Sequence, residues 1–85
     1  LKEDIKEISK KVKILFKRKG YLINWKELEI LNTSQLVDTI SMISPLSIEE
    51  KQSLIEAIDV NERMKILNNI TDLYLLDSFQ NKTIQ

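Results

Sequence analysis

Pro45, the only proline in the chain, marks a point that a continuous helix does not readily cross. Proline has no backbone N–H and disfavours helical backbone at the preceding residue, so a helix that reaches Ser44 is expected to end there. Ser47 follows as a candidate N-cap, and Glu50, three residues later, can complete a capping box. The sequence therefore predicts two helices joined by a short corner at Pro45.

The same capping pattern recurs elsewhere in the chain. Asp59 and Glu62 repeat it and predict the start of another helix. Composition alone predicts about two pairs with this spacing, so the larger observed number favours real helix starts. One of the pairs lies inside an apolar helical pattern and is interpreted as chance. The pairs are Asp4–Glu7, Asn24–Glu27, Ser47–Glu50, Ser53–Glu56 (the one interpreted as chance) and Asp59–Glu62.

Glycine is as rare as proline, since Gly20 is the only one, and the chain has few residues suited to hairpin turns. Apolar residues recur with a period near 3.6, which is typical of amphipathic helices. The sequence predicts an all-α fold, a compact bundle of about five helices. The first spans residues 1–19 and ends at Gly20. The others are a short helix capped by Asn24, residues 34–43, a helix capped by Ser47 and a longer one capped by Asp59, with residues 81–85 frayed.

One face of each helix is expected to be buried in the bundle. The first helix shows this most clearly, with apolar residues on one side and lysines largely opposite. The residues expected to be buried are Leu1, Ile5, Ile8, Val12, Leu15 and Phe16; Trp25, Leu28 and Leu31; Leu36, Val37, Ile40 and Ile43; Ile48, Leu54, Ile55 and Ile58; and Val60, Met64, Leu67, Ile70, Leu73, Tyr74 and Leu76.

Residues 41–67, SMISPLSIEEKQSLIEAIDVNERMKIL, also carry a family resemblance. The stretch resembles the end of the Lon substrate-binding domain, the N-terminal domain of the ATP-dependent Lon proteases. It is most similar to short bacterial proteins that carry this domain alone. The resemblance covers about residues 23–76. Its elements are Ser44-Pro45, Glu50-Lys51-Gln52, Leu54-Ile55-Glu56-Ala57, Asp59 and Arg63, preceded by Ile23-Asn24-Trp25 and Leu36-Val37-Asp38-Thr39-Ile40.

The resemblance implies a fold and a function. The family's domain has a mostly β first half and a helical second half, so residues 1–85 are expected to form a single helical subdomain without the β half. The chain opens on Leu1 rather than Met, and we expect a fragment or a processed product. The implied function is non-catalytic recognition of unfolded or tagged polypeptides for cytoplasmic proteolysis. The implied partners are those polypeptides and the β half of the same protein.

The residue inventory argues against catalysis in this chain. With neither His nor Cys, it lacks the ligands of the usual zinc sites and the base of a His-based triad. Ser47 and Lys51 have the residue types of the Lon Ser–Lys dyad, but that dyad belongs to another domain of the family. We interpret Ser47 as an N-cap and Lys51 as a surface residue. No catalytic, cofactor-binding or metal-binding residue is predicted, the chain is not expected to be an enzyme, and the pattern singles out no substrate-binding residue.

Charge is unevenly distributed and leaves an alternative function open. Residues 1–20 hold eight Lys or Arg and three acidic residues, a balance of +5, while residues 21–85 hold five and ten, a balance of −5. The alternative is an autonomous helical module that binds nucleic acid or a protein partner through the basic helix 6–19. A net charge of zero and the absence of aromatic residues on the basic face make nucleic acid the less favoured partner. No apolar run reaches the length needed to cross a membrane.

Overall fold

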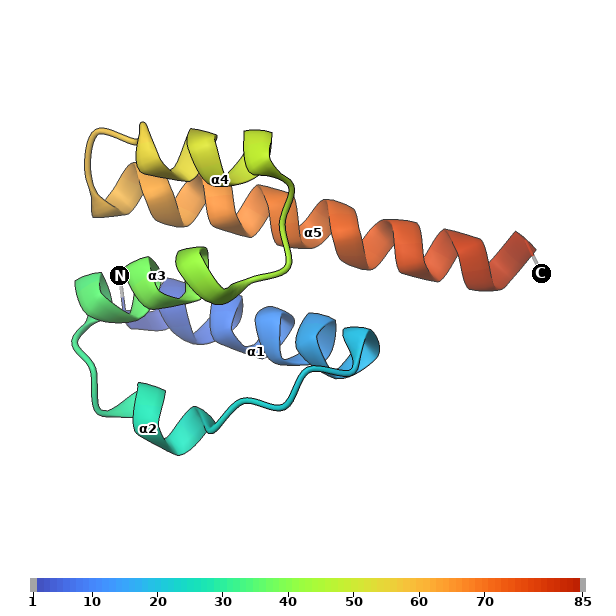
Figure 1. The fold of residues 1–85 in the computed structure, drawn as a ribbon, viewed down its shortest axis with the longest axis horizontal. Helices are drawn as coiled ribbons and strands as arrows, with labels where there is room; N and C mark the ends of the chain where they lie inside the picture. Colours follow the sequence, from blue (N-terminus) through green and yellow to red (C-terminus); the bar gives the residue numbers. More distant parts are fainter. Residues whose placement is uncertain (1, 85) are drawn as a thin grey trace.

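A computed structural model describes the backbone of residues 2–84 and the side chains of residues 5–76. Within this part of the chain every regular element is a helix (Figure 1). The prediction of an all-α fold with five helices is confirmed. The helices are α1 (Lys2–Lys19), α2 (Trp25–Glu29), α3 (Thr33–Ile43), α4 (Ile48–Ile55) and α5 (Val60–Ile84).

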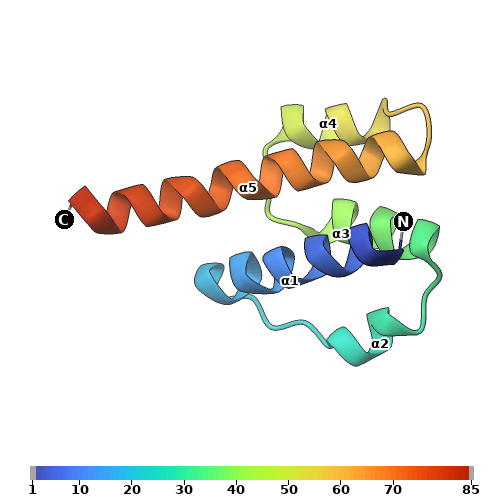
Figure 2. The same ribbon diagram turned by 180° about the vertical axis from the view of Figure 1, so that it is seen from behind.

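Helix α5 organises the bundle because it packs against α1, α3 and α4. In the two opposite views, α4 lies along one side of α5, while α1 and α3 lie along the other (Figures 1 and 2). Helix α2 is short and lies on the outer side of α1. The C-terminal part of α5 extends past the other helices and continues to Ile84, beyond residue 81, where fraying was predicted. Gln85 lies outside the described residues.

The core lies where α1, α3, α4 and α5 meet. The first helix contributes the largest share, as its periodicity predicted, and α5 contributes three residues at helical spacing. Leu1 lies outside the described residues. The buried apolar residues are Ile5, Ile8, Val12, Leu15, Phe16, Val37, Ile40, Leu54, Met64, Leu67 and Ile70.

Several residues predicted to be buried are exposed instead. Ile48 and Ile55 of α4 face solvent, as does Ile58 in the link between α4 and α5. Of the α4 side chains, only Leu54 is fully buried. Leu73 and Leu76 are also exposed, at the end of α5 that leaves the bundle. Ile43 is partly exposed at the last turn of α3, while Trp25, Leu28, Leu31, Leu36, Val60 and Tyr74 are half-buried.

Among the described side chains, three hydroxyl groups are buried, two within helices and one at the C-cap of α3. Ser41, Ser44 and Thr71 each donate a hydrogen bond to the carbonyl four residues earlier, over 2.7, 2.6 and 2.7 Å. A hydroxyl that bonds back to its own helix satisfies its polar group without a partner from another element. Small polar residues can therefore line the core here without the cost of an unpaired donor.

Gly20 ends α1 in the predicted left-handed conformation, with φ +79°. Its N–H donates to the Lys17 carbonyl over 3.1 Å, and the Tyr21 N–H donates to the Phe16 carbonyl over 2.9 Å. This is the hydrogen-bond pattern of a Schellman motif. The Tyr21 ring packs edge-on against Phe16, with ring centroids 5.8 Å apart, which supplies the apolar contact that usually accompanies the motif.

The predicted caps at the Pro45 corner and after it are confirmed. The Glu50 N–H donates to the Ser47 hydroxyl over 3.1 Å, and the Ser47 N–H donates to the Glu50 carboxylate over 2.8 Å. Asp59 accepts from the Glu62 N–H over 2.9 Å, while the Glu62 carboxylate accepts from the N–H of Ile58 over 2.8 Å. Ser44 has extended backbone before the proline, with ψ 143°, as its position predicted.

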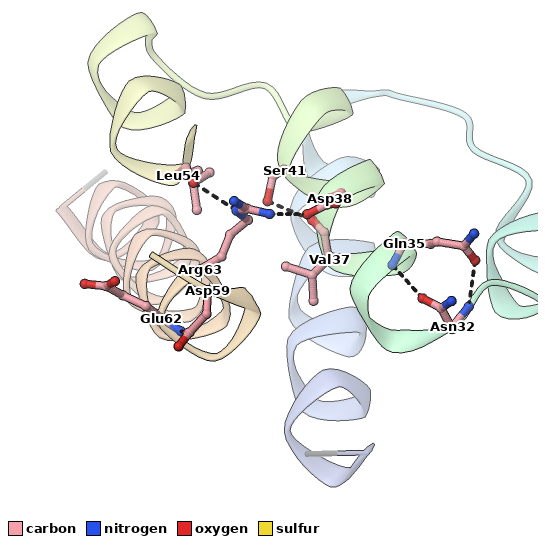
Figure 3. A network of polar contacts seen from close by, with 9 residues as sticks. All are labelled: Asn32, Gln35, Val37, Asp38, Ser41, Leu54, Asp59, Glu62 and Arg63. Atoms are coloured by element: carbon pink, nitrogen blue, oxygen red, sulfur yellow. Dashed lines mark hydrogen bonds and ion pairs between the residues drawn. The ribbon is translucent and has the colours of Figure 1, made fainter. Parts of the chain in front are cut away.

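The other capping predictions fare differently. Asn24 precedes α2, but its side chain makes no capping hydrogen bond. Asp4 lies inside α1 rather than at its start. The Ser53 hydroxyl bonds to the Glu49 carbonyl, which agrees with the interpretation of Ser53–Glu56 as a chance pair. A full capping box forms instead between Asn32 and Gln35 (Figure 3), over 2.8 and 3.1 Å. It starts α3 at Thr33, one residue before the predicted Ser34, and was missed because only Glu was considered at the third position.

Candidate functional site

A groove of about 380 Å³ lies between α3 and α4, and is here called the α3–α4 groove. Its walls include Met42 and Ile55, which are 73% and 70% exposed, although both are large and apolar. Buried Leu54 lies at its base. Polar atoms come from Asp38, Ser41, Lys51 and Arg63. Exposed apolar walls over a packed base can cover an apolar side chain of a partner.

Arg63 holds the two walls of this groove in place (Figure 3). It projects from α5, and its Nε donates to the carbonyl of Leu54 over 2.9 Å, near the C-terminal end of α4. Its Nη1 forms an ion pair with the Asp38 carboxylate on α3. A planar guanidinium can serve both acceptors at once, which a lysine ammonium does less well. Arg63 formed part of the family resemblance, but its role was not predicted from the sequence.

Ser47 and Lys51 both make contacts within the molecule, and Lys51 lines the groove. The Ser47 hydroxyl belongs to the capping box of α4. The Lys51 Nζ donates to the Met42 carbonyl over 2.9 Å and joins α4 to the last turn of α3. Ser47 is the predicted N-cap, whereas Lys51 is a link between two helices rather than a freely solvated lysine.

A second polar contact joins α4 to α5. The Tyr74 hydroxyl donates to the Glu50 carboxylate over 2.6 Å, and the Lys19 ammonium lies 5.9 Å from the centre of the Tyr74 ring. Burial acts to raise the pKa of Glu50, but hydrogen bonds from Tyr74 and Ser47 outweigh it and lower that pKa. The same hydrogen bond, together with burial and the nearby Glu50 charge, raises the pKa of Tyr74. Tyr74 thus connects the C-terminal end of α1 and the middle of α5 with the first turn of α4.

Tyr74→Phe is expected to lower the free energy of unfolding by about 1 kcal/mol near neutral pH, because it removes this hydrogen bond. A depressed carboxyl pKa contributes stability that is present above the unfolded pKa and lost as pH falls through the folded value. The difference between Tyr74→Phe and the parent chain should therefore shrink as pH falls below the ordinary Glu50 value of 4.5. Urea unfolding at several pH values measures this. A difference that does not change with pH would show that the Glu50 charge takes no part.

The basic residues of α1 are not all solvated. Lys11 Nζ lies 3.0 Å from the Asn68 side-chain oxygen and 2.8 Å from the Asp72 carboxylate on α5. Lys13 lies 3.6 Å from the Glu29 carboxylate and 5.5 Å from the centre of the Trp25 ring. Part of the positive charge of residues 1–20 is thus balanced within the molecule.

Two neighbouring hollows of about 440 and 340 Å³ lie on the α1–α2 side. Both are lined by Lys13 and Trp25. The larger runs between α1 and the start of α3, and the smaller surrounds the chain that links α1 to α2. We call the two together the α1–α2 surface.

The family described as the ATP-dependent protease La (LON) substrate-binding domain matches residues 1–72. This chain belongs to the Lon substrate-binding domain family. The matched range includes all of α1, so the Lon resemblance extends further toward the N-terminus than residue 23, where the sequence pattern placed its start. It also includes every residue that lines the α3–α4 groove.

Lon protease 1 of Hydrogenovibrio crunogenus (strain DSM 25203 / XCL-2) is 46% identical to this chain over 54 residues. The aligned part covers 61% of this chain but only 7% of that protease. No solved structure matches the chain. None of the described helices has the length and apolar character of a membrane span.

Proposed function

We propose that this chain is a non-catalytic, cytoplasmic polypeptide-recognition module of a Lon-type protein. Membership of the Lon substrate-binding domain family supports this function. The structural observation that carries it is the α3–α4 groove, in which Met42 and Ile55 are exposed over a rigid polar framework. An unfolded client would place an apolar side chain between these two walls.

The chemistry of the groove suits clients of varied sequence. Methionine is flexible and polarizable, so it can adapt to side chains of different shape. The backbone on both sides is held by Arg63 and Lys51, and the groove is therefore largely preformed. A preformed groove binds without a large ordering cost on the protein side. A single small groove nonetheless offers little contact area, so affinity for one client segment should be low.

Affinity of this chain alone for unfolded polypeptide is expected to be weaker than about 100 μM, or roughly −5.5 kcal/mol. The resemblance suggests that a β-rich segment completes the family's binding surface, so a longer polypeptide containing such a segment should bind more tightly. Titration of a fluorescent unfolded protein measures both. The 85-residue chain should show neither ATP hydrolysis nor peptide cleavage.

Variants of the groove test where binding occurs. Met42→Gln/Ile55→Gln should weaken binding about fivefold, since each substitution removes an apolar contact from the groove wall. The matched control is Ile30→Gln/Ile58→Gln, which changes two apolar residues outside the groove that are at least as exposed as Met42 and Ile55. If both double variants bind as the parent chain does, or if both lose binding equally, the α3–α4 groove is not the client site.

Nucleic-acid binding through residues 6–19 has less support from the structure. Three of the lysines in that segment, Lys11, Lys13 and Lys19, are engaged with other side chains of the molecule. The apolar face of the same helix forms the largest part of the core, so α1 is an integral part of the domain rather than a separate arm.

A further inference from the structure

We propose that the α1–α2 surface binds a polypeptide segment in which carboxylates alternate with apolar side chains. The inference rests on the proposed polypeptide-recognition function, but on a surface separate from the α3–α4 groove. It names the chemical class of polypeptide that the α1–α2 surface would bind.

A row of lysines runs along the α1–α2 surface. Lys6, Lys10, Lys13 and Lys17 are spaced four, three and four residues apart and therefore share one face of α1. The first three line the larger hollow, and the last two line the smaller one. The row thus borders both hollows for three turns of the helix.

Apolar side chains lie beside this row. In the larger hollow they come from Ile5, Leu28, Leu31 and Leu36, and Trp25 lies between the two hollows. In the smaller one, Leu22 is 97% exposed, so almost none of its surface is covered by the rest of the chain. Because Leu22 lies in the link between two helices with its side chain exposed, it offers an apolar contact to a partner.

The charges that face these hollows are strongly one-sided. Glu29 is the only carboxylate among the described residues that line either hollow, and it lies beside Lys13. Lys6, Lys10 and Lys17 therefore leave an excess of positive charge next to the apolar surface. A partner with carboxylates at its apolar edge complements both features, because opposite charges guide association and apolar contacts hold the complex.

The lining favours polypeptide over nucleic acid. Single-stranded nucleic acid uses exposed aromatic rings on which bases stack, in addition to positive charge. In the larger hollow the apolar side chains are aliphatic apart from Trp25, whose ring is already packed edge-on against buried Phe16, with centroids 5.6 Å apart, and lies beneath the Lys13 ammonium. The half-exposed Tyr21 ring in the smaller hollow also packs edge-on against Phe16. Aliphatic side chains provide contacts for leucine or isoleucine, not a stacking platform.

The test compares three labelled probes at low and moderate salt. They are a short peptide in which Glu and Leu alternate, its twin with Gln in place of every Glu, and single-stranded DNA of the same charge as the acidic peptide. The acidic peptide should bind at least about fivefold more tightly than its twin at low salt. The ratio of the two affinities should fall at moderate salt, because salt screens the charges. Equal binding of the two peptides would overturn the proposal.

Matched variants locate the effect. Lys10→Gln/Lys17→Gln should remove most of the preference for the acidic peptide, while Arg18→Gln/Lys65→Gln, with the same loss of charge elsewhere, should retain it. Leu22→Gln should weaken both peptides about threefold, whereas Ile58→Gln, at a residue that is 89% exposed on another part of the molecule, should weaken neither. If the two charge variants behave alike, the effect is one of net charge and the proposal fails.

The remaining outcomes separate this inference from the proposed function. In one outcome, Met42→Gln/Ile55→Gln loses binding of unfolded protein while the parent chain does not bind the acidic peptide. This outcome would overturn the inference about the α1–α2 surface but not the proposed function. Acidic-peptide binding that survives in that double variant would support it, even if unfolded protein does not bind. DNA binding that is tighter than peptide binding, insensitive to Leu22→Gln and steeply reduced by salt would assign the surface to nucleic acid instead.

Discussion

Leu67→Asp is expected to lower the free energy of unfolding by several kcal/mol, enough to unfold most of a small domain. Leu67 is fully buried on α5 and belongs to the cluster that joins this helix to the rest of the bundle. An aspartate at this position would place a carboxylate among apolar side chains with no partner for its charge. Urea or thermal unfolding followed by helical circular dichroism measures the loss.

Lys10→Ala is the control for this result. Lys10 is exposed on α1, and alanine has the higher helix propensity, so the change should alter stability by less than about 0.5 kcal/mol. Similar melting of the two variants would mean that the faces of α1 and α5 are assigned wrongly.

Arg63→Leu is expected to lower the free energy of unfolding by about 2 kcal/mol, although leucine suits a half-buried helix position. The substitution leaves the Leu54 carbonyl without its side-chain donor and Asp38 without its cation. Loss of hydrogen bonds to a charged group is more costly than loss of neutral ones. Chemical denaturation gives the value, and the same variant should loosen the α3–α4 groove.

Two further variants separate the contribution of the Arg63 charge from that of its forked geometry. Arg63→Lys should recover only part of the stability, because an ammonium cannot reach both acceptors in the same geometry. Lys65→Leu makes a comparable change at an exposed residue of the same helix and should alter stability little. A full recovery by lysine would show that charge alone, rather than the forked geometry of Arg63, holds α3 to α4.

Periodicity predicts the fold well where a helix is long and packs along one face. In α1 the spacing identifies every described core residue, from Ile5 to Phe16. It fails in α4, where Ile48 and Ile55 lie seven residues apart on one face, Leu54 lies on another, and periodicity does not say which of these faces meets a neighbour. Leu54 is buried between α3 and α5, while Ile55, one position along the chain, faces outward. That outcome depends on where the neighbouring helices lie, which the local sequence does not encode.

The candidate site was harder to predict than the fold. Met42 and Ile55 looked like ordinary helix residues, and their role as groove walls depends on the angle between α3 and α4. Arg63 and Asp38 are 25 residues apart, and nothing local links them. An arginine beside apolar core positions of α5 was the available signal, since a buried or half-buried charge requires a partner. The row of lysines on α1 was visible in the sequence, but the apolar hollows beside it were not.

The packing of α1 against α5 has a consequence for how the domain is made. A ribosome synthesises α1 before α5, yet the apolar face of α1 that includes Val12 and Phe16 packs in one core with Leu67 of α5. At usual rates of translation this interval lasts on the order of seconds, far longer than helix formation. During this interval, the apolar face of nascent α1 therefore lacks the α5 residues that pack against it in the folded domain. Nascent α1 then exposes the kind of apolar surface that the α3–α4 groove is proposed to bind in an unfolded polypeptide.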